Sequence, residues 1–177
     1  REATIRLLKV PSLTIAETTT RFDSLADYFE LAEAADERHE YAVAWIESLA
    51  TGRALGRGHL IAGDHAADGE RTGIARAPLV AVPITPPISP LRGLALRAFN
   101  EAYYRKARPG TTQRLVSFDQ FFYPLDRVGR WNRLYGPRGL HQHQSVVPAT
   151  TGPDAVRALI ECARSHKQGS FLTVLKR

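Results

Sequence analysis

The stretch LTIAETTTRFDSLADYFELAEAADERHEYAVAWIE, residues 13–47, decides the fold class. Its first part, residues 13–20, is rich in β-branched residues and alternates in character, which is typical of a strand. A helix is expected next, because Ser24 and Asp27 have capping-box spacing and apolar residues recur at helical period up to about Asp36. Residues 41–47 then alternate again, so the stretch predicts a strand–helix–strand unit.

A second unit of the same layout is expected in the C-terminal half. Residues 140–147 have a strand pattern, Thr151 and Asp154 have capping-box spacing at the start of a helix, and residues 171–176 form an apolar strand. Further strands are expected at 3–10, 58–62 and 113–121, a surface loop at 65–77, and another helix at about 91–106. The sequence therefore predicts an α+β fold: an antiparallel sheet of two pseudo-repeated strand–helix–strand units, covered by helices on one face.

The stretch FFYPLDRVGRWNRLYGPRGLHQHQSVVP, residues 121–148, is the candidate wall of a binding site. Aromatic and amide side chains crowd around a Gly-Pro turn there, and such groups need partners when they are buried. In the expected strand 140–147, Gln142 and Gln144 share one face, and His141 and His143 share the other. The two amides suit sugar hydroxyls or a phosphate, but a solvated polar face fits the same spacing. The histidine pair lacks further recognisable ligands, so no metal is expected.

The net charge of +6 is concentrated in one region of the chain. Residues 92–138 carry ten Arg or Lys and three acids. A basic region of this kind suits an anionic substrate, a phosphate group or an acidic membrane surface, so peripheral membrane contact is one expected interaction. A solvated basic face explains the charge equally well. The alternative function is a non-enzymatic α+β module that uses residues 92–138 to bind nucleic acid.

Length and composition favour one globular domain. With 177 residues and 44% hydrophobic content the chain can build a core, and no membrane span or signal peptide is predicted. The chain opens with Arg and has no Met, which predicts a piece of a longer protein. Cys162 and Trp45 are expected in the core by default. Lys176 is the polar exception in the apolar strand 171–176, and either anion binding or simple exposure at the chain end explains it. No nucleophile elbow or metal motif is found, which favours a binding surface over a complete active site.

Six segments of the chain occur in an order that resembles the substrate-binding (cap) domain of FAD-linked oxidases of the vanillyl-alcohol oxidase superfamily. They are YAVAWIE (41–47), YYRK (103–106), FYPLD (122–126), WNRLYGPRG (131–139), QHQSVVP (142–148) and SFLTVLK (170–176). The resemblance covers nearly all of the chain and is strongest to the oxidases of decaprenylphosphoryl-β-D-ribose. The most specific part is the pattern WNRxYGPxG followed by QxQxxVP.

The resemblance implies several properties that the residues alone do not. Residues 1–177 would be the cap domain of a longer flavoenzyme whose FAD-binding domain lies outside this chain, so the isolated chain is expected to be inactive. The reaction would be oxidation of a sugar hydroxyl by FAD, with a small-molecule or lipid-linked anionic sugar as substrate. By motif, the substrate-binding positions are Trp45, Phe122, Tyr123, Asn132, Gln142, Gln144 and Lys176. Phe122 and Tyr123 stand where the family has tyrosine and histidine, which leaves the identity of the substrate open.

Overall fold

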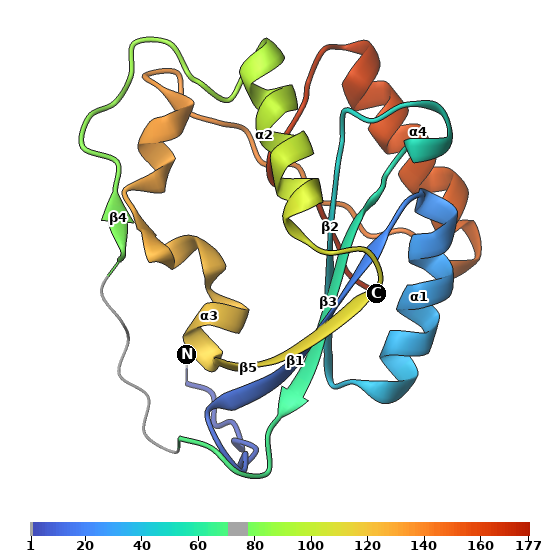
Figure 1. Cartoon of the computed structure of the whole chain (residues 1–177), viewed down its shortest axis with the longest axis vertical. Coiled ribbons are helices and arrows are strands. Elements are labelled where there is room, and N and C mark those ends of the chain that lie inside the picture. The colour runs from blue at the N-terminus through green and yellow to red at the C-terminus, as the bar shows by residue number, and fades with distance from the viewer. Residues whose placement is uncertain (1, 71–77) are drawn as a thin grey trace.

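The computed structural model describes residues 2–70 and 78–177, and its centre is a five-stranded antiparallel sheet (Figure 1). The strands are β1 (Thr14–Phe22), β2 (Tyr41–Ile46), β3 (Gly58–His65), β5 (Thr111–Ser117) and β7 (Val174–Leu175). Their order across the sheet is β5-β1-β3-β2-β7, which puts β3 in the middle. The expected α+β class with an antiparallel sheet is confirmed.

The first of the two expected strand–helix–strand units is formed as predicted, whereas the second lacks its first strand, because residues 140–147 form none. β1 and β2 run antiparallel to β3, so they are parallel to each other, and α1 (Leu25–Arg38) connects them. β5 and β7 pair antiparallel with β1 and β2, and α4 (Gly152–Ser165) precedes β7. The first unit therefore supplies the strands beside β3, the second unit supplies only the edge strand β7, and β5 forms the other edge.

α1 and α4 cover one face of the sheet, and the main hydrophobic core lies between them and the strands (Figure 1). Its largest members are Phe22, Leu25, Tyr28, Ile46, Leu55, Leu60, Val156 and Ile160. Gly58 is required where β2 and β3 begin to pair, because a Cβ there would lie 2.0 Å from the carbonyl oxygen of Trp45. Only glycine lets the two backbones approach this closely.

The remaining elements lie mainly at the second face of the sheet. They are α2 (Gly93–Lys106), the short helix α3 (Phe118–Phe122), and a parallel pair formed by β4 (Val80–Ala81) and β6 (Val128–Gly129). Short 3-10 turns occupy Gly52–Ala54, Pro124–Arg127, Trp131–Tyr135 and Ala149–Thr151. The turn at Gly52–Ala54 leads into β3.

The N-termini of α1 and α4 are capped differently. The Ser24 hydroxyl oxygen accepts a hydrogen bond of 3.2 Å from the backbone N–H of Asp27, as the sequence predicts. The Thr151 hydroxyl instead donates to the carbonyl oxygen of Pro148 at 3.2 Å and makes no bond to the helix. The predicted capping box of Thr151 and Asp154 is therefore wrong.

Several expected strands are absent or shorter than predicted. Residues 3–10 and 140–147 form no strand, and most of their large apolar side chains are exposed. The strand expected at 113–121 ends at Ser117, where α3 begins, and the last strand is limited to Val174–Leu175. Cys162 is exposed on α4, and residues 71–77 of the expected loop 65–77 lie outside the described residues. Alternation does not suffice for a strand, because a strand also needs a neighbour for its backbone hydrogen bonds.

The two N-caps allow a matched stability test. Ser24→Ala removes the acceptor for the Asp27 N–H, so we expect the free energy of unfolding to fall by about 1 kcal/mol. Thr151→Ala removes only an exposed bond within a turn, and its loss should stay below about 0.5 kcal/mol. Urea unfolding followed by circular dichroism measures both changes. Equal losses for the two variants would show that Ser24 does not act as a cap.

Candidate functional site

The face of the sheet opposite to α1 and α4 carries aromatic and charged side chains. Because side chains alternate along a strand, these residues are the sequence neighbours of the core residues. They are Ile15, Glu17, Tyr41, Trp45, His59, His65, Arg114 and Val116, joined by Tyr103 of α2 and by Phe121 and Phe122 of α3. We call this set the aromatic face.

Trp45 lies within the aromatic face and is only 5% exposed. Its indole Nε1 donates a hydrogen bond of 2.8 Å to the carbonyl oxygen of Phe171. Its ring meets Tyr103 edge-on, with ring centroids 4.7 Å apart, and lies 5.5 Å from the ring of His59. In this chain Trp45 is therefore a packed residue of a second, smaller core beneath α2.

His59 is buried beside Trp45. Its Nε2 donates to the carbonyl oxygen of Tyr104 at 2.8 Å, since a carbonyl oxygen can only accept. Burial lowers the pKa of His59; the hydrogen bond to Tyr104 opposes this shift, and the charges of Arg21 and Lys106 add to it. The fold thus favours the neutral imidazole.

Phe122 and Tyr123 are placed differently although they are adjacent in sequence. The ring of Phe122 packs edge-on against Tyr41, with centroids 4.9 Å apart, and against Phe121 at 5.0 Å. Tyr123 is 55% exposed, and its ring lies 6.4 Å from that of Phe122. Phe122 therefore adds an apolar edge to the aromatic face, whereas Tyr123 lies at its border and is open to solvent.

An ion pair that the sequence analysis missed lies on the same face. The buried carboxylate of Glu17 accepts hydrogen bonds from Arg114 Nε at 2.7 Å and from Thr19 Oγ1 at 3.0 Å. Burial raises the pKa of Tyr103, and the negative charge of Glu17 raises it further. One feature of the sequence indicates this pair. Glu17 lies two residues after Ile15 on a strand and therefore shares its face, and an acid that is buried on such a face needs a partner.

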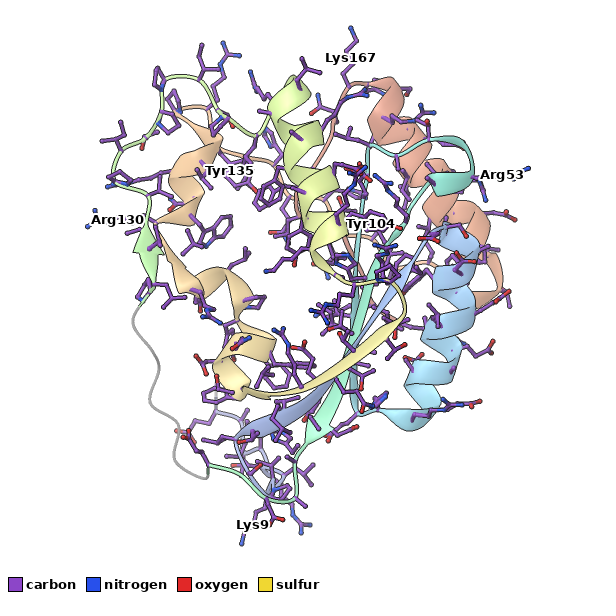
Figure 2. All side chains as sticks on the ribbon, in the orientation of Figure 1. Lys9, Arg53, Tyr104, Arg130, Tyr135 and Lys167 are labelled. Atoms are coloured by element: carbon purple, nitrogen blue, oxygen red, sulfur yellow. The ribbon has the colours of Figure 1, made fainter. Side chains whose placement is uncertain are left out.

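The segment Trp131–Tyr135 reaches the aromatic face through Tyr135. The Tyr135 ring lies 5.7 Å from that of Phe171, whose carbonyl holds Trp45, and 6.0 Å from that of Trp131. Figure 2 shows Tyr135 between this segment and α2. Aromatic residues of the stretch 121–148 thus border the face, while Asn132 itself is exposed.

Gln142 and Gln144 lie on an irregular, exposed segment. Because the strand expected at 140–147 is absent, alternation cannot separate these glutamines from His141 and His143, and that part of the sequence analysis is wrong.

Lys176 directly follows β7. β2 and β7 pair Trp45 with Val174 and Ala44 with Leu175; the pairing ends there, and Lys176 is exposed at the edge of the sheet. The structure therefore brings Trp45 and Phe122 to one face and leaves Tyr123, Asn132, the two glutamines and Lys176 exposed.

Two features are absent from residues 2–70 and 78–177: a metal-binding cluster and a membrane-spanning helix. No group of three or more His, Cys, Asp or Glu side chains in these ranges is placed to hold a metal ion. Within the same ranges no helix is long and apolar enough to cross a bilayer.

No protein-family model matches the chain. Among curated proteins, the chain is similar to a decaprenylphosphoryl-beta-D-ribose oxidase of Mycolicibacterium smegmatis, with 29% identity over 154 residues. The match covers 82% of this chain and 33% of that protein, so the chain spans about a third of the length of its relative. The resemblance predicted from the six segments is thereby confirmed.

The burial of Trp45 leads to a stability prediction. Trp45→Ala should lower the free energy of unfolding by about 3–5 kcal/mol, because it leaves a cavity and removes the bond to Phe171. Trp131→Ala, at a partly exposed site, is the matched control and should lose less. Urea unfolding followed by far-ultraviolet circular dichroism measures both. A loss below about 2 kcal/mol for Trp45→Ala would mean that one side of the indole is open.

The lowered pKa of His59 leads to a pH prediction. In the unfolded chain the histidine has its ordinary pKa of about 6.5 and binds a proton more readily than in the fold. Neutral His59 therefore contributes to the free energy of unfolding above that pKa. This contribution is lost as the pH falls through the folded-state pKa. We expect the urea midpoint to fall from pH 7 to pH 5 and His59→Gln to reduce this dependence. His143→Gln, at an exposed position, is the control and should keep the wild-type profile.

Proposed function

We propose that this chain is the substrate-binding (cap) domain of an FAD-dependent oxidoreductase that oxidises a sugar hydroxyl. The substrate we propose is a decaprenylphosphoryl-ribose-like or related anionic glycoside. The observation that carries the proposal is the 29% identity to a decaprenylphosphoryl-beta-D-ribose oxidase over 154 residues. Because the match covers 33% of that protein, the proposal assigns the rest of the activity to residues outside this chain.

The glycine-containing turn between β2 and β3 does not fit the phosphates of FAD. Glycines 52–58 form a turn between β2 and β3, not the loop between a strand and a helix whose N-terminus would face a pyrophosphate. In this proposal FAD is held outside the chain, and when bound there it supplies the redox chemistry at the carbinol carbon. The cap domain contributes binding, orientation and charge.

The aromatic face supports a sugar-binding role. Binding sites for small molecules combine apolar and aromatic walls with a few placed polar groups. Phe122 and Tyr135 supply such walls, and Lys176 would pair with a phosphate of an anionic glycoside. The excess of basic residues at 92–138 adds a field that favours the same anion.

Nucleic-acid binding has less support. It would need aromatic side chains on an exposed surface, interleaved with basic ones, so that bases could stack on them. Tyr104 is buried against His59, and Tyr103 packs against Trp45. The aromatic residues of the segment YYRKAR are therefore engaged within the fold.

The roles of Gln142 and Gln144 can be tested in the full-length polypeptide that contains this chain. Each Gln→Ala change should remove a hydrogen bond to the bound sugar or phosphate, a loss of about 0.5–1.5 kcal/mol. This corresponds to a fall in kcat/KM of roughly 2- to 15-fold per residue in a steady-state oxidase assay.

His141→Ala and His143→Ala are the matched controls on the same exposed segment. They should leave kcat/KM within about twofold of the wild type. Essential histidines together with silent glutamines would overturn the assignment.

A further inference from the structure

α2 turns its apolar side away from the sheet. Its buried residues are Leu96, Asn100 and Tyr104, whereas Leu94 is 84% exposed. Ala95, Ala98, Phe99 and Ala102 are exposed as well. These five apolar residues recur at intervals of three and four, so they form a stripe along the helix, and this stripe faces outward.

The proline-rich segment before α2 extends this exposed apolar surface. Leu79, Val80, Ile84 and Ile88 are between 67% and 76% exposed. Figure 1 shows the segment running from β4 along the outer margin of the molecule to α2, on the side away from α1 and α4. We call these four residues, together with the exposed apolar residues of α2, the apolar margin.

Hydrogen bonds hold the backbone beneath the apolar margin. Arg133 donates to the carbonyl oxygens of Val82 and Pro83. The Ser89 hydroxyl donates to the carbonyl oxygen of Leu134 at 2.7 Å. The segment between β4 and α2 is thus hydrogen-bonded to Arg133 and Leu134, while its apolar side chains remain exposed.

The charged residues within the segment 78–100 have one sign. Residues 78–100 contain no Asp or Glu, but they include Arg92 and Arg97, both exposed. Glu101, the next acid, pairs with Arg57 and Arg105. Exposed apolar residues on a helix with basic neighbours are typical of helices that lie on an anionic membrane.

We propose that the apolar margin docks on an anionic lipid bilayer. Ile84, Ile88 and Leu94 would enter the boundary between headgroups and acyl chains, and Arg92 and Arg97 would contact lipid phosphates. A protein strand is a poor occupant, because the prolines at 83, 86, 87 and 90 have no backbone N–H to donate. The inference rests on exposure and charge, and it stands independently of the proposed reaction.

Vesicle co-sedimentation of the full-length polypeptide tests the proposal. It should bind vesicles of phosphatidylcholine mixed with phosphatidylglycerol, and bind less to phosphatidylcholine alone or at raised salt. Arg97→Glu should lower the partition coefficient by roughly 5- to 30-fold. Ile88→Asp should lower it by at least about tenfold.

Two control variants carry the same changes elsewhere on the surface. Leu115 of β5 is 68% exposed, and Leu115→Asp should leave vesicle binding within about twofold. Arg53 lies in the turn before β3, far from the apolar margin in Figure 2, and Arg53→Glu should do the same. Equal losses in the control and margin variants would overturn the proposal in favour of non-specific charge attraction.

A second outcome would also overturn the proposal. If the rest of the polypeptide covers the apolar margin, the wild type will ignore anionic vesicles and Ile88→Asp will lower its melting temperature. Neither result depends on catalysis. Failure of vesicle binding is therefore distinguishable from failure of the sugar-oxidation proposal, which the glutamine variants report.

Discussion

The hydrogen bond from the Trp45 indole to the Phe171 carbonyl fixes how the last part of the chain lies on the sheet. The neighbouring residue Ser170 is held as well, because its carbonyl oxygen accepts from Asn100 Nδ2 and Ser48 Oγ, both at 3.1 Å. Its N–H also donates to Ser48 Oγ at 3.0 Å. β2, the loop after it and α2 thus meet at one point of the chain. Losing any of these partners would leave a buried polar group unpaired, at about 1–3 kcal/mol.

This clamp explains the orientation of α2. Asn100 is fully buried and its Nδ2 donates to Ser170, while Leu96 and Tyr104 are buried on the same helix, so this side of α2 faces the sheet. The apolar stripe then has to face outward, although hydrophobicity alone would turn it inward. The clamp also lies close to β7, which begins three residues after Phe171 and pairs with β2 through Val174 and Leu175. This group of hydrogen bonds thus links the packing of Trp45 to the orientation of the helix that carries the surface proposed to meet a membrane.

Local sequence predicts the helices and the central strands, but it does not predict the polar contacts that orient them. Ser24 caps α1 through a residue three positions away, which a reader of the sequence can see. Asn100 reaches Ser170, 70 residues away, and Glu17 reaches Arg114, 97 residues away. Such partners are set by the tertiary fold, so neither the orientation of α2 nor the buried ion pair could be predicted. The strand pattern at 140–147 failed for a related reason, since its local alternation is present but no partner strand lies beside it.

The difference between Trp45 and the two glutamines suggests how a sugar would be recognised in the proposed enzyme. Trp45 is already fixed, and it shapes the aromatic face through Tyr103 and Phe171, which it holds in place. The glutamines lie on irregular backbone, so ordering them on binding costs about 1–2 kcal/mol per residue and offsets much of what their hydrogen bonds contribute. Affinity would then come mainly from the preformed aromatic face and from charge. The glutamines would act on selectivity instead, because a sugar that lacks the matching hydroxyl leaves an ordered amide unpaired.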